Sequence, residues 1–122
     1  MLLTLAFPLG CIGCSDGGSA TYEQISGAEA KALMDSESGY IIIDARTQPE
    51  YDEGHIAGAI LIPEYEIAAR AEAELPDKEQ LILVYCRSGR RSKIAAEELV
   101  KLGYTNVFEF GGIIDWEYDV VK

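Results

Sequence analysis

The sequence predicts an α/β domain in which helices flank a mainly parallel central sheet of about five strands. Two short runs of apolar residues, at positions 40–43 and 81–85, have the pattern of strands that are buried on both faces. Segments with the apolar spacing of a helix alternate with the strands along the chain, and residues 92–102 are the clearest of them. Strands that are joined by helices in this way lie parallel to one another in one sheet.

The composition favours one globular domain and excludes several kinds of function. The chain has 122 residues, of which 48% are hydrophobic, and this length supports a single modest core. Its net charge of −11 argues against a nucleic-acid partner. Three cysteines are too few for a disulfide framework, and no His or Cys cluster has the spacing of a metal site. We expect neither a metal nor a cofactor.

The first twenty residues have a different character, so we expect a signal and linker over 1–20 and the domain over 21–122. Residues 1–12 are apolar and uncharged, too short to span a bilayer and similar to the apolar part of a secretory signal. Two Gly-Cys pairs, which end at Cys11 and Cys14, each resemble the end of a bacterial lipoprotein signal. We expect export and a lipid anchor on Cys14 or, as second choice, Cys11. A disordered tail on a cytoplasmic protein is the alternative.

Local signals mark the other elements. Ser26 and Glu29 have the spacing of a capping box, in which the two residues satisfy free N–H groups at the start of a helix. Gly103 is placed to end the helix over 92–102 in a left-handed turn, and the glycine pair at 111–112 is expected to break the chain after the last strand. Further strands are expected at residues 22–25, 59–62 and 106–110, and further helices at residues 26–36, 49–54 and 64–75.

Charged residues follow the strand over 40–43, at the carboxyl edge of the sheet where open α/β folds place their sites. We expect Asp44 and Arg46 to pair with each other or to brace a neighbouring loop, not to take part in the chemistry. His55 is the only histidine, and we expect it to fix a loop through hydrogen bonds and not to act as a base for a cysteine. Trp116 is expected to pack over the sheet edge.

The segment after the strand over 81–85 carries the chemistry. Cys86 opens a loop that holds Arg87, Arg90 and Arg91, three of the ten basic residues of the chain. Backbone N–H groups in a tight turn at the start of a helix favour negative charge. We therefore expect an anion-binding cradle with the cysteine at its rim, ionised near neutral pH without a separate base. A buried structural cysteine before a solvated basic turn is the alternative.

Three segments together resemble the rhodanese family of sulfurtransferases, in the order and spacing of that family. They are residues 43–59, with I-D-A-R, E-Y and G-H-I-A-G-A; residues 85–92, with Y-C-R-S-G-R-R-S; and residues 103–116, with G-Y, N-V, G-G-I and W. Each segment alone would be weak evidence, but jointly they are specific. The resemblance extends over roughly residues 22–120.

The resemblance implies a rhodanese-like three-layer sandwich in which Cys86 carries sulfur. It also implies that Arg91, the last arginine of the C-x-x-G-x-R pattern, helps to bind an anionic donor. In similar proteins the groups that match Asp44 and Arg46 hold the active-site loop in place, so we expect these two as supporting residues. The residues expected to bind substrate are Arg87, Ser88, Gly89, Arg90 and Arg91.

The expected reaction moves a sulfane sulfur from thiosulfate or a similar donor to a thiophilic acceptor, through a persulfide on Cys86. One alternative is a persulfide carrier or binding module that delivers sulfur to a protein partner. Another is a phosphatase or arsenate reductase, but related enzymes of those classes place one residue more between cysteine and arginine. Here four residues separate Cys86 from Arg91, and the tighter loop suits one sulfur atom.

Overall fold

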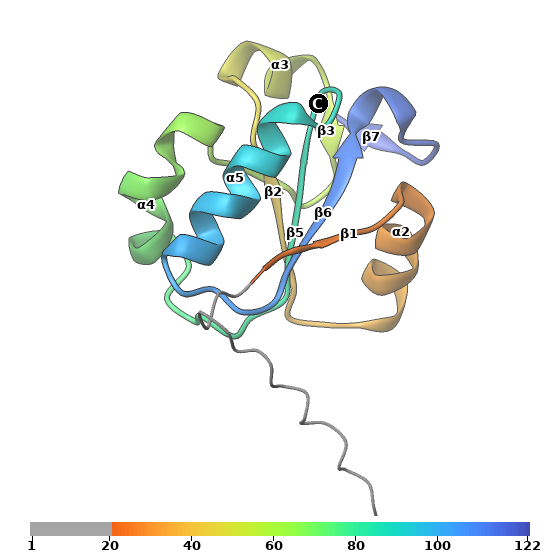
Figure 1. Cartoon of the computed structure of the whole chain (residues 1–122). Helices are drawn as coiled ribbons and strands as arrows, with labels where there is room; N and C mark the ends of the chain where they lie inside the picture. The colour runs from red at the N-terminus through yellow and green to blue at the C-terminus, as the bar shows by residue number, and fades with distance from the viewer. Residues whose placement is uncertain (1–20) are drawn as a thin grey trace, which may run out of the picture.

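A five-stranded parallel sheet runs through the middle of the structure, a computed structural model that describes residues 21–122 (Figure 1). The strand order is β1-β6-β5-β2-β4, and every neighbouring pair is parallel. The predicted mainly parallel α/β sheet is therefore confirmed. The strands are β1 (Glu23–Gln24), β2 (Ile41–Asp44), β4 (Ile60–Leu61), β5 (Ile82–Cys86) and β6 (Val107–Gly112).

Helices cover both faces of the sheet and make three layers (Figure 1). On one face lie α4 (Ile67–Glu74) and α5 (Arg90–Lys101), and on the other lies α2 (Gly27–Ser36). Side chains of β5 alternate between the two faces, as strand geometry requires. Val84 and Cys86 belong to the apolar cluster under α4 and α5, whereas Leu83 and Tyr85 belong to the cluster under α2. Burial on both faces explains why this strand is apolar throughout.

Two predicted helix ends rest on local chemistry that the structure confirms, whereas α5 begins at Arg90, two residues before the predicted start. Ser26 Oγ accepts the N–H of Glu29 at 3.0 Å, and Glu29 Oε1 accepts the N–H of Ser26 at 2.9 Å, which completes the capping box of α2. At the end of α5, Gly103 has a φ of +101°, a conformation that favours glycine. The short helix expected near residue 50 is α3 (Gln48–Glu53).

Three features differ from the predictions. First, β6 continues through its two terminal glycines, so the expected break after residue 110 is wrong. Second, the helix expected over 64–75 is divided into a 3₁₀ turn, η3 (Glu64–Glu66), and α4. Third, a small antiparallel sheet joins β3 (His55–Ile56) to β7 (Val120–Val121), and two-residue strands are too short to leave a periodic pattern in the sequence.

The segment before β7 contains the tryptophan that was expected to pack over the sheet. Trp116 follows η4 (Ile113–Asp115) and is partly buried. Its ring centroid lies 5.6 Å from that of Phe110 and 4.9 Å from that of Tyr118. The tryptophan therefore extends the apolar cluster under α2 toward the chain end, as predicted.

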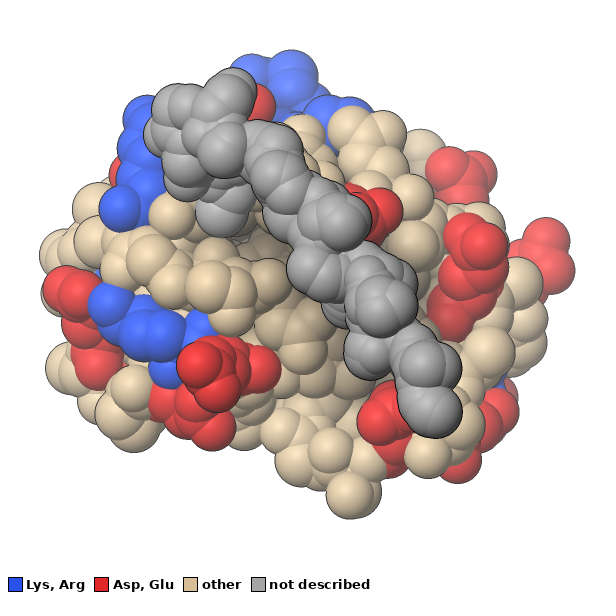
Figure 2. All heavy atoms as spheres, turned by 60° about the horizontal axis from the view of Figure 1, so that its bottom comes forward, with Lys and Arg blue, Asp and Glu red and all other residues tan. Residues whose placement is uncertain are grey.

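The surface reflects the excess of acid in the composition. Figure 2 shows the face at the bottom of Figure 1, where acidic side chains are spread across the surface and most of the visible basic ones lie toward one side. Four of the ten basic residues fall within residues 87–93, on the loop after β5 and the first turn of α5. Within the described chain, no helix combines the length and the apolar character that a membrane span requires. Cys14 and Cys11, the first and second choice for the lipid anchor, lie outside the described residues.

Candidate active site

The candidate active site lies at the carboxyl end of β5, where Cys86 is the last residue of the strand. A loop of three residues leads from Cys86 to α5, and Gly89, with a φ of +110°, turns the chain into the helix. The N–H of Gly89 points back at the sulfur, and its nitrogen lies 3.0 Å from Cys86 Sγ. The first turn of a helix has N–H groups without intrahelical partners and a partial positive charge, so this position favours an anionic sulfur.

Cys86 is 1% exposed and lies beneath the loop. The expectation that its thiol sits at the rim of the loop is therefore wrong. The sulfur nevertheless has polar partners on the loop side, because Ser92 Oγ lies 3.4 Å from Sγ in addition to the N–H of Gly89. A substrate has to reach the sulfur from the loop side, since the strand side is filled by the apolar cluster under α4 and α5.

Gly112 on β6 lets the loop lie this close to the sheet. A Cβ atom at this position would lie 2.0 Å from the carbonyl oxygen of Arg87 and 2.5 Å from Cα of Ser88. The N–H of Ile114 donates to the same carbonyl oxygen at 3.2 Å, which ties the loop to the segment after β6. Sequence reasoning read the glycine pair only as a break. Its position directly after the predicted strand over 106–110 was the one signal of a close approach.

Arg91, the predicted donor-binding arginine, is held by Glu50 of α3. Its two terminal nitrogens each lie 2.9 Å from one carboxylate oxygen of Glu50, a bidentate pair. The N–H and the hydroxyl of Thr47 also donate to Glu50 Oε1. The hydrogen bond from Arg91 is the main cause that lowers the pKa of Glu50 to about 2, against a smaller opposing effect of burial. Sequence reasoning did not find Glu50, because it is 41 residues from its partner.

Three of the other residues expected to bind substrate face solvent. Arg87, Ser88 and Arg90 are exposed, while Gly89 is buried under them. Within residues 21–122, neither Arg87 nor Arg90 forms an ion pair. Their guanidinium groups are therefore available to an anion that approaches the loop, and their role in substrate binding stays a prediction.

Asp44 and Arg46 pair with each other inside the protein, as one of the two expectations had it. Arg46 Nε and Nη2 lie 2.9 Å and 2.7 Å from the carboxylate oxygens of Asp44, which is fully buried. Tyr85 donates its hydroxyl to Asp44 at 2.6 Å, and burial followed by this hydrogen bond raises the pKa of Tyr85. Arg46 also donates to the carbonyl oxygen of Gly54 at 2.7 Å. The pair thus holds in place both Gly54, which precedes β3, and Tyr85, which precedes Cys86.

His55 has the structural contacts that were expected of it. Its Nδ1 atom lies 2.9 Å from the carbonyl oxygen of Tyr51, and its ring stacks on the ring of Tyr51 with the centroids 3.7 Å apart. Both contacts fix the turn between α3 and β3. One acidic residue near the thiol was missed altogether: Glu109 on β6 accepts a hydrogen bond from Ser92. A glutamate inside an otherwise apolar strand was the signal available in the sequence.

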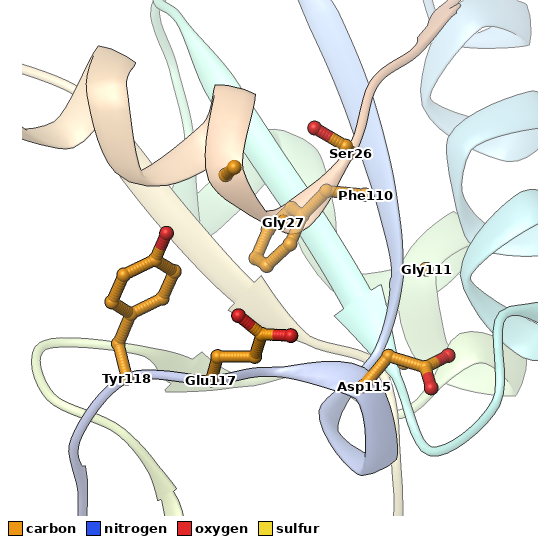
Figure 3. A pocket seen from close by; sticks show the side chains of 9 residues that line it. Ser26, Gly27, Phe110, Gly111, Asp115, Glu117 and Tyr118 are labelled. Atoms are coloured by element: carbon orange, nitrogen blue, oxygen red, sulfur yellow. The ribbon is translucent and has the colours of Figure 1, made fainter.

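A separate pocket lies on the α2 side of the sheet (Figure 3). Phe110 projects between the first turn of α2 and the segment that carries Glu117 and Tyr118. Because Phe110 belongs to the apolar cluster under α2 and Cys86 to the cluster on the opposite face, this pocket is not the cradle of the thiol. In the part of the chain that the structure describes, no three His, Cys, Asp or Glu side chains are grouped to hold a metal ion.

Comparison with known proteins links this geometry to named relatives. The sequence pattern of the Rhodanese-like domain matches residues 26–119. Thiosulfate sulfurtransferase PspE of Escherichia coli is 41% identical over 80 residues, which cover 66% of this chain and 77% of that protein. Thiosulfate sulfurtransferase GlpE of Coxiella burnetii is 36% identical over 97 residues, or 79% of this chain and 88% of that protein. Putative sulfur carrier protein YrkF of Bacillus subtilis is 34% identical, over 84% of this chain but only 55% of that protein.

Solved structures show the same likeness. A structure described as rhodanese with anions from E. coli superposes with a TM-score of 0.64 at 40% identity, over 68% of this chain and 98% of that one. A rhodanese-related protein from Thermoplasma volcanium superposes with a TM-score of 0.69 at 31% identity, over 82% of this chain and 98% of that one. The similarity therefore extends from the sequence to the three-dimensional arrangement of the domain.

Proposed function

Because the chain belongs to the rhodanese family and is a sulfurtransferase of the rhodanese type, we propose that it transfers a sulfane sulfur by way of a persulfide on Cys86. The donor is thiosulfate or a similar small anion, and the acceptor is a thiophile. The observation that carries the proposal is the position of Cys86 Sγ, which accepts the N–H of Gly89 at 3.0 Å beside the N-terminus of α5. The names of two relatives, thiosulfate sulfurtransferase, support the donor class.

The proposed reaction has two displacement steps. The thiolate of Cys86 attacks the outer sulfur of thiosulfate, the sulfur–sulfur bond of the donor breaks, and sulfite leaves with the electron pair. The cysteine then holds a persulfide whose terminal sulfur is an anion. An acceptor such as cyanide or a thiolate attacks that sulfur, takes it, and returns the cysteine to the thiolate. Nucleophile and intermediate are both sulfur anions, so the preorganised N–H of Gly89 can serve both steps.

The charged residues near Cys86 have different tasks in this proposal. Arg87 and Arg90 are exposed and free of ion pairs within residues 21–122, so they attract the anionic donor to the loop. Arg91 is held by its ion pair with Glu50, so its positive charge stays at a fixed position near Cys86. Asp44 and Arg46 support the strand ends around Cys86 without touching the reacting atoms.

A second proposal concerns the acceptor. One relative is named a putative sulfur carrier protein, and such a role needs the same persulfide but passes it to a protein. The exposed Tyr65 and Ile114 lie on η3 and η4, both at the carboxyl end of the sheet. Turnover with thiosulfate and cyanide that is slow compared with persulfide loading would favour the carrier role over small-molecule transfer.

The decisive experiment is the intact mass of the protein before and after thiosulfate. We expect the mass to rise by one sulfur atom and to fall again when cyanide is added. Cys86→Ser should abolish the gain, whereas Cys14→Ser, a matched loss of another thiol, should leave it unchanged. A gain of sulfur that survives in the Cys86 variant would refute the assignment of the nucleophile.

The lipid anchor on Cys14 or Cys11 remains our proposal from the sequence, and with it an extracytoplasmic, membrane-anchored location. It is supported by the two Gly-Cys pairs that follow the apolar start of the chain. The same mass measurement, made on protein extracted from host membranes, tests it. An unmodified N-terminus that still begins at Met1 would refute the anchor and favour the cytoplasmic alternative.

A further inference from the structure

A buried carboxylate lies behind the thiol of Cys86. Glu109 of β6 is 2% exposed and is in register with Val84, two residues before the cysteine on β5. Its Oε2 atom accepts hydrogen bonds from Ser92 Oγ at 2.5 Å and from the N–H of Gly111 at 2.9 Å. A carboxylate buried in a strand costs free energy that an apolar side chain at the same position would not cost. Its presence next to the nucleophile points to a role in the chemistry.

Ser92 connects this carboxylate to the sulfur. Its hydroxyl has one hydrogen and lies 2.5 Å from Glu109 Oε2, 3.0 Å from the carbonyl oxygen of Gly89 and 3.4 Å from Cys86 Sγ. The shortest of these distances assigns the hydrogen to Glu109, because the charged acceptor makes the strongest bond. A lone pair of Ser92 Oγ is then free to accept the S–H of Cys86. The three side chains form one continuous hydrogen-bonded chain.

We propose that Glu109 accepts the proton of Cys86 through Ser92, so that the thiol ionises without releasing a proton to solvent. The S–H bond breaks and leaves its electron pair on sulfur. The proton passes to Ser92 Oγ, whose own proton forms an O–H bond on Glu109 Oε2. No electron is transferred, and the single negative charge moves from the carboxylate to the sulfur.

The physical reason for the relay is that it avoids a second negative charge in the buried site. A thiolate formed next to an ionised Glu109 would place two negative charges in a buried site, whereas the relay keeps one. The new thiolate also keeps two hydrogen-bond donors, the N–H of Gly89 and the hydroxyl of Ser92, which now carries the hydrogen that came from the sulfur. Glu109 acts through Ser92 and touches no reacting atom.

The charged groups around the relay come from two elements, α5 and β1. Lys93 of α5 places its Nζ atom 3.8 Å from Glu109 Oε1, the carboxylate oxygen that Ser92 does not contact. Arg91, from the same helix, has a raised pKa, chiefly through its hydrogen bond to Glu50 and in smaller part through the charge of Cys86. From β1, the exposed Glu23 lies in register with Phe108, and the uncharged Gln24 lies in register with Glu109.

The relay changes one expectation drawn from the sequence, namely that the basic loop alone would ionise the thiol. It rests on the proposed function only in that Cys86 is the reacting thiol. The two ideas fail separately, because ionisation of the thiol is measured without turnover and persulfide loading is measured by mass.

The test is a titration of the thiolate by its ultraviolet absorbance, in the full chain with Cys11→Ser and Cys14→Ser so that Cys86 is the only thiol. Absorbance is followed from about pH 4 to about pH 9, below the range in which ordinary tyrosines ionise. We expect two steps with Glu109 in place, because the thiol and the carboxylate titrate as a coupled pair. In Glu109→Gln the lower step should disappear and the thiolate should form in one step, because the amide cannot take up the proton.

Two controls separate the relay from a structural effect. Ser92→Ala should also remove the lower step, and Glu109→Gln should then add nothing to it. Glu97→Gln makes the same charge change on the exposed face of α5 and should leave both steps in place. A single step with Glu109 present would overturn the proposal. So would a Glu109→Gln protein that keeps both steps, since the lower step would then not belong to the carboxylate.

Discussion

Replacing Gly112 by alanine should displace the loop over Cys86 and remove most of the sulfur-transfer activity. The added Cβ would lie 2.0 Å from the carbonyl oxygen of Arg87 and 2.5 Å from Cα of Ser88, whereas real Cβ atoms stay beyond 3.0 Å from such neighbours. Both neighbours are backbone atoms, so β6 and the loop have to separate by at least about 1 Å. Gly112 has φ −126° and ψ 153°, an extended conformation that any residue can adopt. The steric contact of the added Cβ with the loop is therefore the only reason that alanine is disfavoured here.

A separation of this size reaches the nucleophile directly. Ser88 is adjacent to Gly89, whose N–H lies against Cys86 Sγ. Misplacement of a catalytic group by about 1 Å costs roughly 100-fold in rate, and we expect a loss of that order in kcat/KM for thiosulfate and cyanide. Overpacking should lower the free energy of unfolding by about 1–3 kcal/mol.

The measurement combines the rate with a control at a second glycine. Assays are run well below the Tm of each variant, with circular dichroism to show that the fold is kept. Gly27→Ala is the matched control, because its Cβ would lie 3.5 Å from a ring carbon of Trp116, an ordinary contact. A Gly112→Ala enzyme that keeps kcat/KM within about threefold of the parent would refute the reasoning.

Two further predictions concern the ion pairs around the site. The pKa of Glu50, lowered to about 2 mainly by its hydrogen bond from Arg91, means that the charged carboxylate stabilises the fold fully above about pH 5 and loses this effect as the pH falls toward 2. Because the two side chains are about a quarter exposed, the charged carboxylate contributes about 1–2 kcal/mol to the free energy of unfolding. The free energy of unfolding in urea should therefore depend less on pH in Glu50→Gln than in the parent. An equal pH dependence in the two proteins would contradict this prediction. Asp44→Asn leaves Arg46 buried without its counter-charge, so the free energy of unfolding should fall by about 3–5 kcal/mol in urea unfolding. A loss below about 1 kcal/mol would contradict this prediction.

The sequence alone predicted the fold class, which the structure confirms, and it singled out Cys86 as the candidate nucleophile. The apolar run before Cys86 predicts a strand buried on both faces, and the structure places it in the centre of the sheet. The capping box at Ser26 and the left-handed turn at Gly103 are equally local, because each depends on the backbone within one turn of a helix. Such signals lie within a few residues of one another and can be read in order along the chain.

The tertiary structure decided which residues surround the thiol. Glu50 meets Arg91 across 41 residues of sequence, and Glu109 meets Ser92 across 17. The close approach of Gly112 to Arg87 likewise depends on β6 lying beside β5. The physical reason is that these contacts follow from strand order and register, which bring distant segments to one edge of the sheet, whereas apolar periodicity and capping report only on neighbours in the chain.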